Sequence, residues 1–238
     1  MKTQRGISLV EIMVAITLGL LLMLGLGTVF VSVSQTSKLR QNMSGVQDNE
    51  RTAIAFLNSN IRSAGFNPNP ANVNLFTASG SFTTTGQTIY GSGSGVGADT
   101  VSVRFIAPAA GATTSQGCSA ALTAGDVYQD DFSVAGGYLT CTETDITAGG
   151  AAAPAVNLVP NLAGMNIVYG IDQNCTGSVT EYLSGSSVPS TVWGGPCTPG
   201  GQLKTVNITL QFNNPLTGQP GQQPTVTINQ TIPYMIGL

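Results

Sequence analysis

Glu11 places a carboxyl group inside an apolar segment of this chain. Residues 12–37 contain no Asp, Glu, Lys or Arg, and the part from Ile12 to Val33 is mostly Leu, Val, Ile, Met and Ala. A carboxylate in a membrane helix costs about 2.5–3.5 kcal/mol, so such a residue usually has a partner and a function. The alternative explanation is that Glu11 lies near the helix end and extends to the lipid headgroups.

The apolar segment is long enough to cross a bilayer as one helix, which takes about 20 residues. Lys2 and Arg5 precede it, and the positive-inside rule then places the N-terminus in the cytoplasm and the rest of the chain outside. A secretory signal peptide is the alternative, but its apolar part spans only about 7–15 residues. The longer run here continues into a helical pattern, which favours a helix that is retained.

The N-terminal residues resemble the class III signal of type IV pilins and of the pseudopilins of type II secretion. The resemblance covers the run KTQRGISLVEIMVA, from Lys2 to Ala15. In that family a prepilin peptidase cuts after a Gly on the cytoplasmic side and methylates the new N-terminus, and a Glu is the fifth residue of the mature chain. The resemblance therefore implies cleavage after Gly6, N-methylation of Ile7 and an assembly role for Glu11. Ile7 stands where the family usually has Phe.

Cleavage after Gly6 would leave a cationic amine on Ile7. In a filament, the Glu11 carboxylate of an incoming subunit could pair with the Ile7 amine of a neighbour. Such a pair is far stronger in a low-dielectric core than in water, and an unpaired charge there is penalised. We therefore predict that charge pairing sets the register between subunits while the apolar helices pack in the filament core.

A helical pattern continues beyond the apolar segment. Seven apolar residues recur at steps of three, four or seven, which places them on one helix face. They are Leu39, Met43, Val46, Ala53, Leu57, Ile61 and Ala64. Gly65 suits a helix C-cap and Pro68 prevents continuation, so one helix is expected from about Ser8 to Ala64. Close packing and local melting are equally good explanations for the glycines at 19, 25, 27 and 45.

The residues at the end of this helix resemble one subgroup of that family. Residues 49–57, NERTAIAFL, and residues 61–66, IRSAGF, resemble the pattern "R..AF…IR.AGF" of PilW-type minor pilins, and J-type pseudopilins are similar. The resemblance implies the type IV pilin fold, an α+β fold in which a long N-terminal helix packs on an antiparallel β-sheet domain with long loops. The alternative for Arg51 and Arg62 is that they are ordinary solvated helix charges.

After Pro70 several short runs alternate between apolar and polar side chains, which is typical of half-buried strands. The expected strands are 99–106, 138–141, 156–159, 164–171, 203–212 and 225–232. Stretches of small residues between them are interpreted as long surface loops, at 78–97, 107–117, 147–155 and 184–201. A sheet packed against one helix gives an α+β domain.

Four cysteines follow the membrane segment: Cys118, Cys141, Cys175 and Cys197. Because their number is even and the expected compartment is oxidising, disulfides are predicted. All three connectivities are open, and sequential pairing would close two loops of about 22 residues, each worth about 3 kcal/mol in the chain-entropy model. A metal site is not expected, since the chain has no CxxC motif and no His.

The composition excludes several classes of function. The chain has 238 residues, no His, 8% charged residues and a net charge of −3. Catalysis by Ser-His-Asp or Cys-His and His-ligated metals are thereby excluded, and nucleic-acid binding would need clustered basic residues. The acids at 126, 130 and 131 and those at 172 and 181 lack the spacing of a calcium loop, and we interpret them as solvated turn carboxylates. We expect no enzyme activity, no cofactor and no metal.

Four segments are predicted: a leader at 1–6, a transmembrane or filament-core helix at 7–34, an amphipathic half-helix at 35–66 and a β-rich domain at 67–238. The resemblance implies a minor pilin that lies in the inner membrane before assembly and in an extracellular pilus afterwards. Its implied partners are the prepilin peptidase, other minor pilins, the major pilin and a large tip adhesin. A J-type pseudopilin and a membrane-anchored periplasmic enzyme or binding protein stay open as alternatives.

Overall fold

The computed structural model of the chain describes residues 8–69, 76–108, 117–118, 122–193, 197 and 200–234. Contacts within the chain define two compact units, Met1–Gly45 and Val46–Leu238. The boundary falls inside the long N-terminal helix. The second unit therefore consists of the C-terminal part of that helix together with all the strands.

Helix α1 spans Leu9–Arg62 without interruption, which confirms the long helix predicted from the sequence. At its start, the carbonyl oxygen of Ser8 accepts hydrogen bonds from the N–H groups of Glu11 (3.0 Å) and Ile12 (3.3 Å). Beyond its end, Gly65 has a φ of 82°, the left-handed conformation that a C-cap glycine provides. The N–H of Gly65 donates to the carbonyl oxygen of Arg104 at 2.8 Å, so the cap also joins the helix end to a strand.

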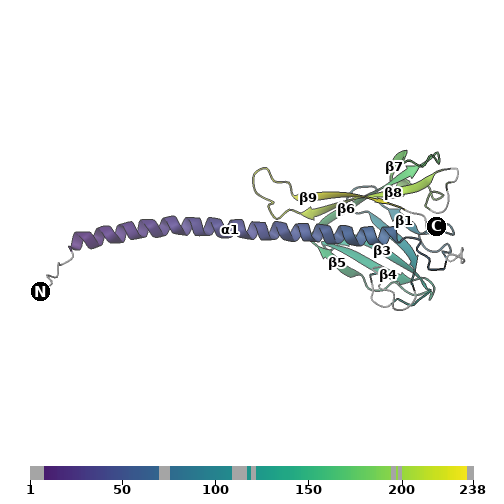
Figure 1. Cartoon of the computed structure of the whole chain (residues 1–238), viewed down its shortest axis with the longest axis horizontal. Coiled ribbons are helices and arrows are strands. Elements are labelled where there is room, and N and C mark those ends of the chain that lie inside the picture. The colour runs from purple at the N-terminus through teal and green to yellow at the C-terminus, as the bar shows by residue number, and fades with distance from the viewer. Residues whose placement is uncertain are drawn as a thin grey trace. The chain divides into compact units, whose positions relative to one another are not determined.

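The strands form two antiparallel sheets (Figure 1). The first has the order β1-β2-β3-β4-β5, a simple meander. Its strands are β1 (Ile89–Ser92), β2 (Thr100–Ile106), β3 (Val127–Ala135), β4 (Tyr138–Asp145) and β5 (Val156–Pro160). The second sheet has the order β7-β6-β8-β9. Its strands are β6 (Leu162–Asp172), β7 (Glu181–Ser184), β8 (Gln202–Asn213) and β9 (Thr225–Pro233), and a short 3₁₀ helix, η1 (Gly185–Ser187), follows β7.

One core joins the C-terminal part of α1 to both sheets. The helix contributes Val46, Ala53, Leu57 and Ile61, and Ala64 just beyond its end joins them, so five of the seven residues expected on the apolar face lie in this core. The sheets contribute, among others, Val101, Val103, Phe132, Leu139, Ile167, Tyr169, Val206, Ile208 and Phe212. The predicted α+β fold, a long helix packed on antiparallel strands, is confirmed. Two sheets are present where one was expected, because an alternating pattern predicts strands but not which strands pair.

A short segment before β2 joins the two sheets to each other. The N–H of Met165 in β6 donates to the carbonyl oxygen of Gly97, and the N–H of Asp99 donates back to that of Met165. The Asp99 side chain is buried and accepts hydrogen bonds from the N–H groups of Ile167 (2.7 Å) and Gly95 (3.0 Å). These bonds hold the beginning of the first sheet against the centre of the second.

All six predicted strands are present, with ends that differ by a few residues. Three strands were missed. β1 and the end of β7 lie in regions expected to be loops, and β3 contains the adjacent acids Asp130 and Asp131, which hide its alternation. The loop predicted over 147–155 contains no helix or strand, as expected. Most of the loop predicted over 107–117 lies outside the described residues.

Candidate functional site

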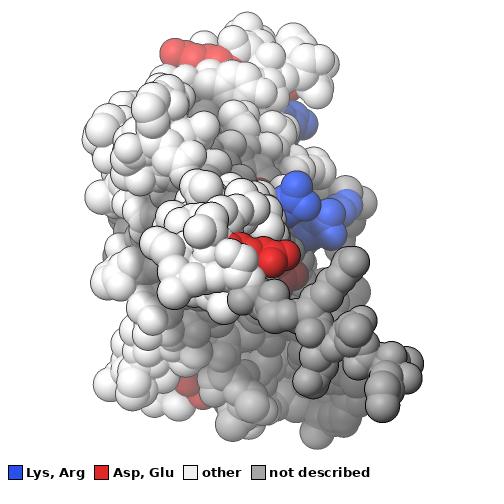
Figure 2. Space-filling model, turned by 90° about the vertical axis from the view of Figure 1, so that its left-hand side faces the viewer, with Lys and Arg blue, Asp and Glu red and all other residues white. Residues whose placement is uncertain are grey.

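The N-terminal half of α1 presents an uncovered apolar surface. Its large apolar side chains, from Leu9 to Val33, are all exposed. Among the described residues, one helix, α1, is long and apolar enough to cross a membrane. Its most apolar 18-residue stretch contains no buried residue. In the view of Figure 2, most of the surface that belongs to described residues is neither Lys, Arg, Asp nor Glu. An apolar surface of this kind is unstable in water and requires lipid or other apolar helices around it.

Polar side chains within the apolar segment bond to the helix itself. The hydroxyl groups of Thr17, Thr28 and Thr36 donate to the carbonyl oxygens of Val14, Gly25 and Ser32 at 2.8–2.9 Å. In hydrocarbon no water can satisfy a hydroxyl group, so such internal bonds are required there. This segment is therefore suited to lipid or to a dry filament core along the length that was predicted.

Glu11 lies in the first turn of α1 and is exposed. Its negative charge is favourable there, because the N-terminus of a helix carries partial positive charge. None of the residues that the structure describes forms an ion pair with it. The predicted cleavage and methylation residues, Gly6 and Ile7, lie outside the described residues. The pairing of Glu11 with a neighbour's Ile7 amine therefore stays a prediction.

The glycines of α1 leave open space beside the helix. The helix is continuous at Gly19, Gly25, Gly27 and Gly45, and a Cβ atom at any of them would have no neighbour within 4 Å. Nothing among the described residues thus packs against these glycines. Both predicted explanations, packing against other helices and melting on assembly, refer to states with other chains present.

The motif at the helix end has a structural explanation for part of its pattern. Arg51 and Arg62 are exposed, as expected for solvated helix charges. Gly65 provides the cap described above. Phe66 then donates its N–H to the carbonyl oxygen of Ser63 and accepts the N–H of Ile106 at 2.9 Å. The residues Ala64 to Phe66 therefore turn the chain and join the helix end to β2.

The four predicted disulfide cysteines form two bonds, Cys118–Cys141 and Cys175–Cys197. The Cα–Cα distances are 6.0 and 5.8 Å, and the sequence separations are 23 and 22 residues. Of the three connectivities that the sequence left open, the structure has the sequential one. The first bond joins Cys118, which lies outside the strands, to Cys141 on β4.

Asp130 is not a solvated turn carboxylate, so that prediction is wrong. It lies on β3 with no exposed surface, and its direct cross-strand partner on β4 is Glu143, which is also buried. The pKa of Asp130 is raised to about 8, mainly by burial and in addition by the neighbouring carboxyl groups of Glu143 and Asp131. No described Lys or Arg forms an ion pair with Asp130. At neutral pH the pair Asp130–Glu143 therefore retains a proton.

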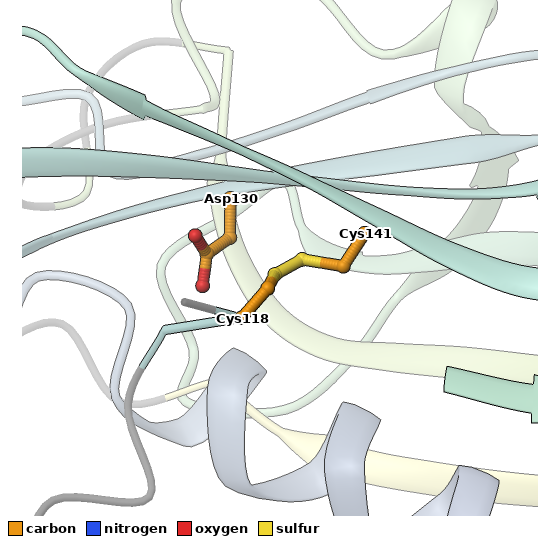
Figure 3. A group of neighbouring side chains, drawn as sticks. All are labelled: Cys118, Asp130 and Cys141. Atoms are coloured by element: carbon orange, nitrogen blue, oxygen red, sulfur yellow. A yellow bond between two sulfur atoms is a disulfide. The ribbon is translucent and has the colours of Figure 1, made fainter. Parts of the chain in front are cut away.

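Asp130 lies against the Cys118–Cys141 disulfide (Figure 3). A carboxyl oxygen of Asp130 and the two Sγ atoms all lie within 4.8 Å of one another. On the other side of the pair, a carboxyl oxygen of Glu143 accepts the N–H of Cys118 at 3.0 Å. Two thiolates and a carboxylate could ligate a metal, but both sulfurs are joined in the disulfide, which removes the thiolate ligands.

The second acidic group differs from its prediction in another way. Asp172 is buried, and it accepts hydrogen bonds from the N–H groups of Thr176 (3.0 Å) and Gly177 (2.6 Å). Burial alone would raise the pKa of Asp172, but these hydrogen bonds outweigh it and lower the pKa. The ionised carboxylate thus shapes the turn that contains Cys175, and Glu181 stays exposed as predicted.

Arg104 is a buried residue whose role the sequence did not indicate. Its alternating position in β2 predicted the solvent-facing side, yet it is 1% exposed. Its guanidinium donates to the carbonyl oxygens of Thr77 and Ser79, both at 2.8 Å, and lies 3.8 Å from the ring centroid of Phe82. Burial lowers the pKa of Arg104 to about 10, against the opposing charge of Asp131. Arg104 therefore fastens the loop around residues 77–82 over β2.

Comparisons with known proteins identify the N-terminal segment. Residues 1–27 match the family described as the prokaryotic N-terminal methylation motif. A type IV-like pilin from Thermus thermophilus is similar in structure with a TM-score of 0.43 at 12% identity, over 79% of this chain and 94% of that chain. A search of curated proteins found no match. The chain thus has a segment that matches the prokaryotic N-terminal methylation motif at the start of a long helix, and the C-terminal part of that helix packs on two antiparallel sheets.

Proposed function

We propose that this protein is a minor pilin of a type IV pilus. The observation that carries the proposal is the position of Glu11, five residues after Gly6, in the first turn of a helix whose apolar side chains are uncovered. An anchor that only held a domain to the membrane would not need an acid at that depth. An acid that must find a partner in another subunit explains both its place and the absence of one among the described residues.

Assembly then follows from the chemistry of this segment. A prepilin peptidase cuts between Gly6 and Ile7 on the cytoplasmic face and methylates the Ile7 amine. The subunit leaves the inner membrane when its helix enters the filament core, where apolar side chains of neighbouring subunits replace lipid. The Glu11 carboxylate pairs with the Ile7 amine of a neighbour, and a subunit in the wrong register leaves both charges unpaired in a low-dielectric core.

The resemblance of residues 49–66 to PilW-type minor pilins supports a position in or near the pilus tip. There the protein would join other minor pilins to prime assembly on the major pilin and would present a large tip adhesin. A J-type pseudopilin of a type II secretion system shares the same helix pattern and is the second candidate. A secretin with a retraction ATPase encoded nearby supports the pilus, and an exoprotein secretion operon supports the pseudopilus.

Mass spectrometry of sheared pili tests the proposal. We expect a mature chain that begins at Ile7 with a methylated amine, present at a small fraction of the major pilin. A chain that retains Met1 and stays in the membrane would contradict the proposal and favour a membrane-anchored enzyme or binding protein. Abundance equal to that of the main subunit would make the protein a major pilin instead.

A further inference from the structure

We propose that Cys118–Cys141 is a redox-responsive disulfide and that the buried Asp130–Glu143 pair supplies the proton for its opening. This inference does not depend on the proposed function. It rests on the arrangement in Figure 3, where the Asp130 carboxyl group and the disulfide point toward each other between β3, β4 and the segment at residues 117–118. The register of the sheet fixes this arrangement, because Asp130 pairs with Glu143 and Phe132 pairs with Cys141 on the same face.

The two sulfurs of this bond have different environments. Cys118 is half-buried, whereas Cys141 is fully buried in the main core. A reductant can therefore reach the sulfur of Cys118, and Cys141 becomes the leaving group. A thiolate in an apolar environment is strongly disfavoured. Opening the bond therefore requires that a proton reach the Cys141 sulfur within the core.

Asp130 meets that requirement. Its carboxyl oxygen lies within 4.8 Å of both sulfurs, it has no exposed surface, and no backbone N–H of the described residues donates to it. Burial keeps its pKa at about 8, so the group carries a proton at neutral pH and can release it to a stronger base. The thiolate of a cysteine, with a reference pKa of about 8.5, is such a base.

Other charged groups near the pair do not compete for this role. Glu143 shares the proton of Asp130, and one of its oxygens is occupied by the N–H of Cys118. Asp131 points to the opposite face of β3, where it accepts hydrogen bonds from Gln129. Arg104 also lies on that opposite face. The buried residues of α1 are all uncharged. The cross-strand partner of Asp130 on β2 is Val103, which is also uncharged.

The step is balanced with a dithiol as reductant. One thiolate of the dithiol attacks the Cys118 sulfur, the S–S bond breaks, and a mixed disulfide forms while the electron pair leaves on Cys141. Asp130 transfers its proton to that sulfur, and the resulting carboxylate regains a proton from solvent. The second thiol of the dithiol then displaces Cys118 from the mixed disulfide. The products are the two cysteine thiols and the disulfide form of the dithiol.

The second disulfide is a control within the same molecule. Cys175–Cys197 has a similar span and a similar Cα–Cα distance. Its printed contact with Asp172 is to the backbone carbonyl oxygen, 3.9 Å from the Cys197 sulfur, while the Asp172 carboxylate accepts hydrogen bonds from Thr176 and Gly177 that lower its pKa. Asp172 therefore has no proton to give. A proton-donor effect should appear at Cys118–Cys141 and not at Cys175–Cys197.

The test measures reduction of each disulfide by dithiothreitol in the full chain in detergent micelles. Samples are quenched, alkylated and digested, and mass spectrometry reports each bond separately. Each rate is divided by the concentration of dithiothreitol thiolate. This division corrects for the change in the reductant's ionisation with pH. We expect the rate for Cys118–Cys141 to fall as the pH rises through about 8, and Asp130→Asn to lower it by about tenfold or more below that pH, as loss of a general acid does. The rate for Cys175–Cys197 should not change.

Two results would overturn the proposal. One is an unchanged rate and pH profile for Cys118–Cys141 in Asp130→Asn. The other is a parallel change in both disulfides, which would mean that the variant only loosens the fold. If Asp130→Asn does not fold, the wild-type chain still decides, because the ratio of the two rates must depend on pH. A ratio that is the same on both sides of about pH 8 overturns the proposal.

Discussion

Asp130 and Glu143 face each other as direct cross-strand partners on β3 and β4, and both carboxyl groups are buried, at 0% and 6% exposure. Two carboxylates so close in a buried site cannot both ionise at moderate cost. The folded chain therefore retains a proton that the unfolded chain, with an ordinary Asp pKa near 4, releases. This difference couples the stability of the second unit to pH.

The stability of the protein should fall as the pH rises from about 4 to about 8. In this window the unfolded state binds fewer protons than the folded state, so the free energy of unfolding decreases with pH, by about 1.4 kcal/mol per pH unit at most for one group. The contribution is fully present below the unfolded pKa of Asp130 and is lost as the pH passes the folded pKa of about 8. Asp130→Asn should flatten this dependence.

The measurement is the urea midpoint of the full chain in detergent, with both disulfides intact, at about pH 5 and at about pH 9. Asp48→Asn provides a control, because Asp48 is an exposed acid on α1. Its stability should change with pH as much as that of the wild type. Equal slopes in the wild type and in Asp130→Asn would contradict the shared proton.

The sequence predicted this molecule best where a pattern was long. The periodicity of α1 extends over many turns, so its existence, its cap at Gly65 and four of its five buried residues could be predicted, Asn60 being the exception. Asp130 could not, because the adjacent acids in β3 look like a turn, and only the pairing of β3 with β4 shows that Asp130 faces the core. The disulfide connectivity could not be predicted either, because spacing alone allowed all three arrangements.

Arg104 shows why the burial of β2 could not be predicted either. Alternation predicts one apolar and one polar face, but both faces of β2 are covered, one by the core and one by the loop around residues 77–82. The polar face is covered because Arg104 donates hydrogen bonds to two carbonyl oxygens of the loop and packs against the Phe82 ring. Nothing in the sequence around Phe82 links it to a strand more than twenty residues later.

Arg104→Ala should lower the free energy of unfolding by about 3 kcal/mol. The change removes the guanidinium hydrogen bonds to Thr77 and Ser79, two longer ones to the Gln129 side chain and a cation–π contact, and it leaves the carbonyl oxygens of Thr77 and Ser79 with no guanidinium donor. Arg62→Ala is the matched control, because Arg62 is exposed and its loss should change stability by no more than about 0.5 kcal/mol. Urea unfolding checks both. An effect of Arg104→Ala as small as that of Arg62→Ala would show that the loop is held by other contacts.

Gly91→Ala should also destabilise the fold, by about 1–3 kcal/mol or more. Tyr169 crosses over Gly91 so closely that a Cβ atom there would lie 1.8 Å from the Tyr169 hydroxyl oxygen, and the Tyr169 ring is held in turn by Trp193 at a centroid distance of 4.7 Å. Gly150→Ala is the control, because its nearest contact would be at 3.4 Å. The two variants are compared by their urea midpoints, and a wild-type midpoint for Gly91→Ala would contradict the close packing.

Glu11→Ala should separate processing from assembly. Cleavage depends on Gly6 and the basic leader, so the variant should be cut and methylated at Ile7 in the membrane. The neighbour's Ile7 amine would then enter a low-dielectric core without its carboxylate, and breaking a buried pair in this way costs about 3–5 kcal/mol. The amount of variant in sheared pili should fall by about tenfold or more, since about 1.4 kcal/mol already corresponds to tenfold. Glu11→Gln should behave like Glu11→Ala, because it keeps the shape and removes the charge.

Two measurements on the same culture make this prediction decisive: the mature N-terminus of the membrane-bound pool, and the quantity of the chain in sheared pili. Asp48→Ala is the control on the same helix, outside the apolar segment and exposed, and it should change neither. Glu11→Ala at wild-type levels in pili would contradict the pairing with Ile7. A variant that keeps its leader would show that Glu11 acts earlier, in recognition by the peptidase, because an unprocessed chain still has the Gly6–Ile7 peptide bond and therefore offers no amine at Ile7 for pairing.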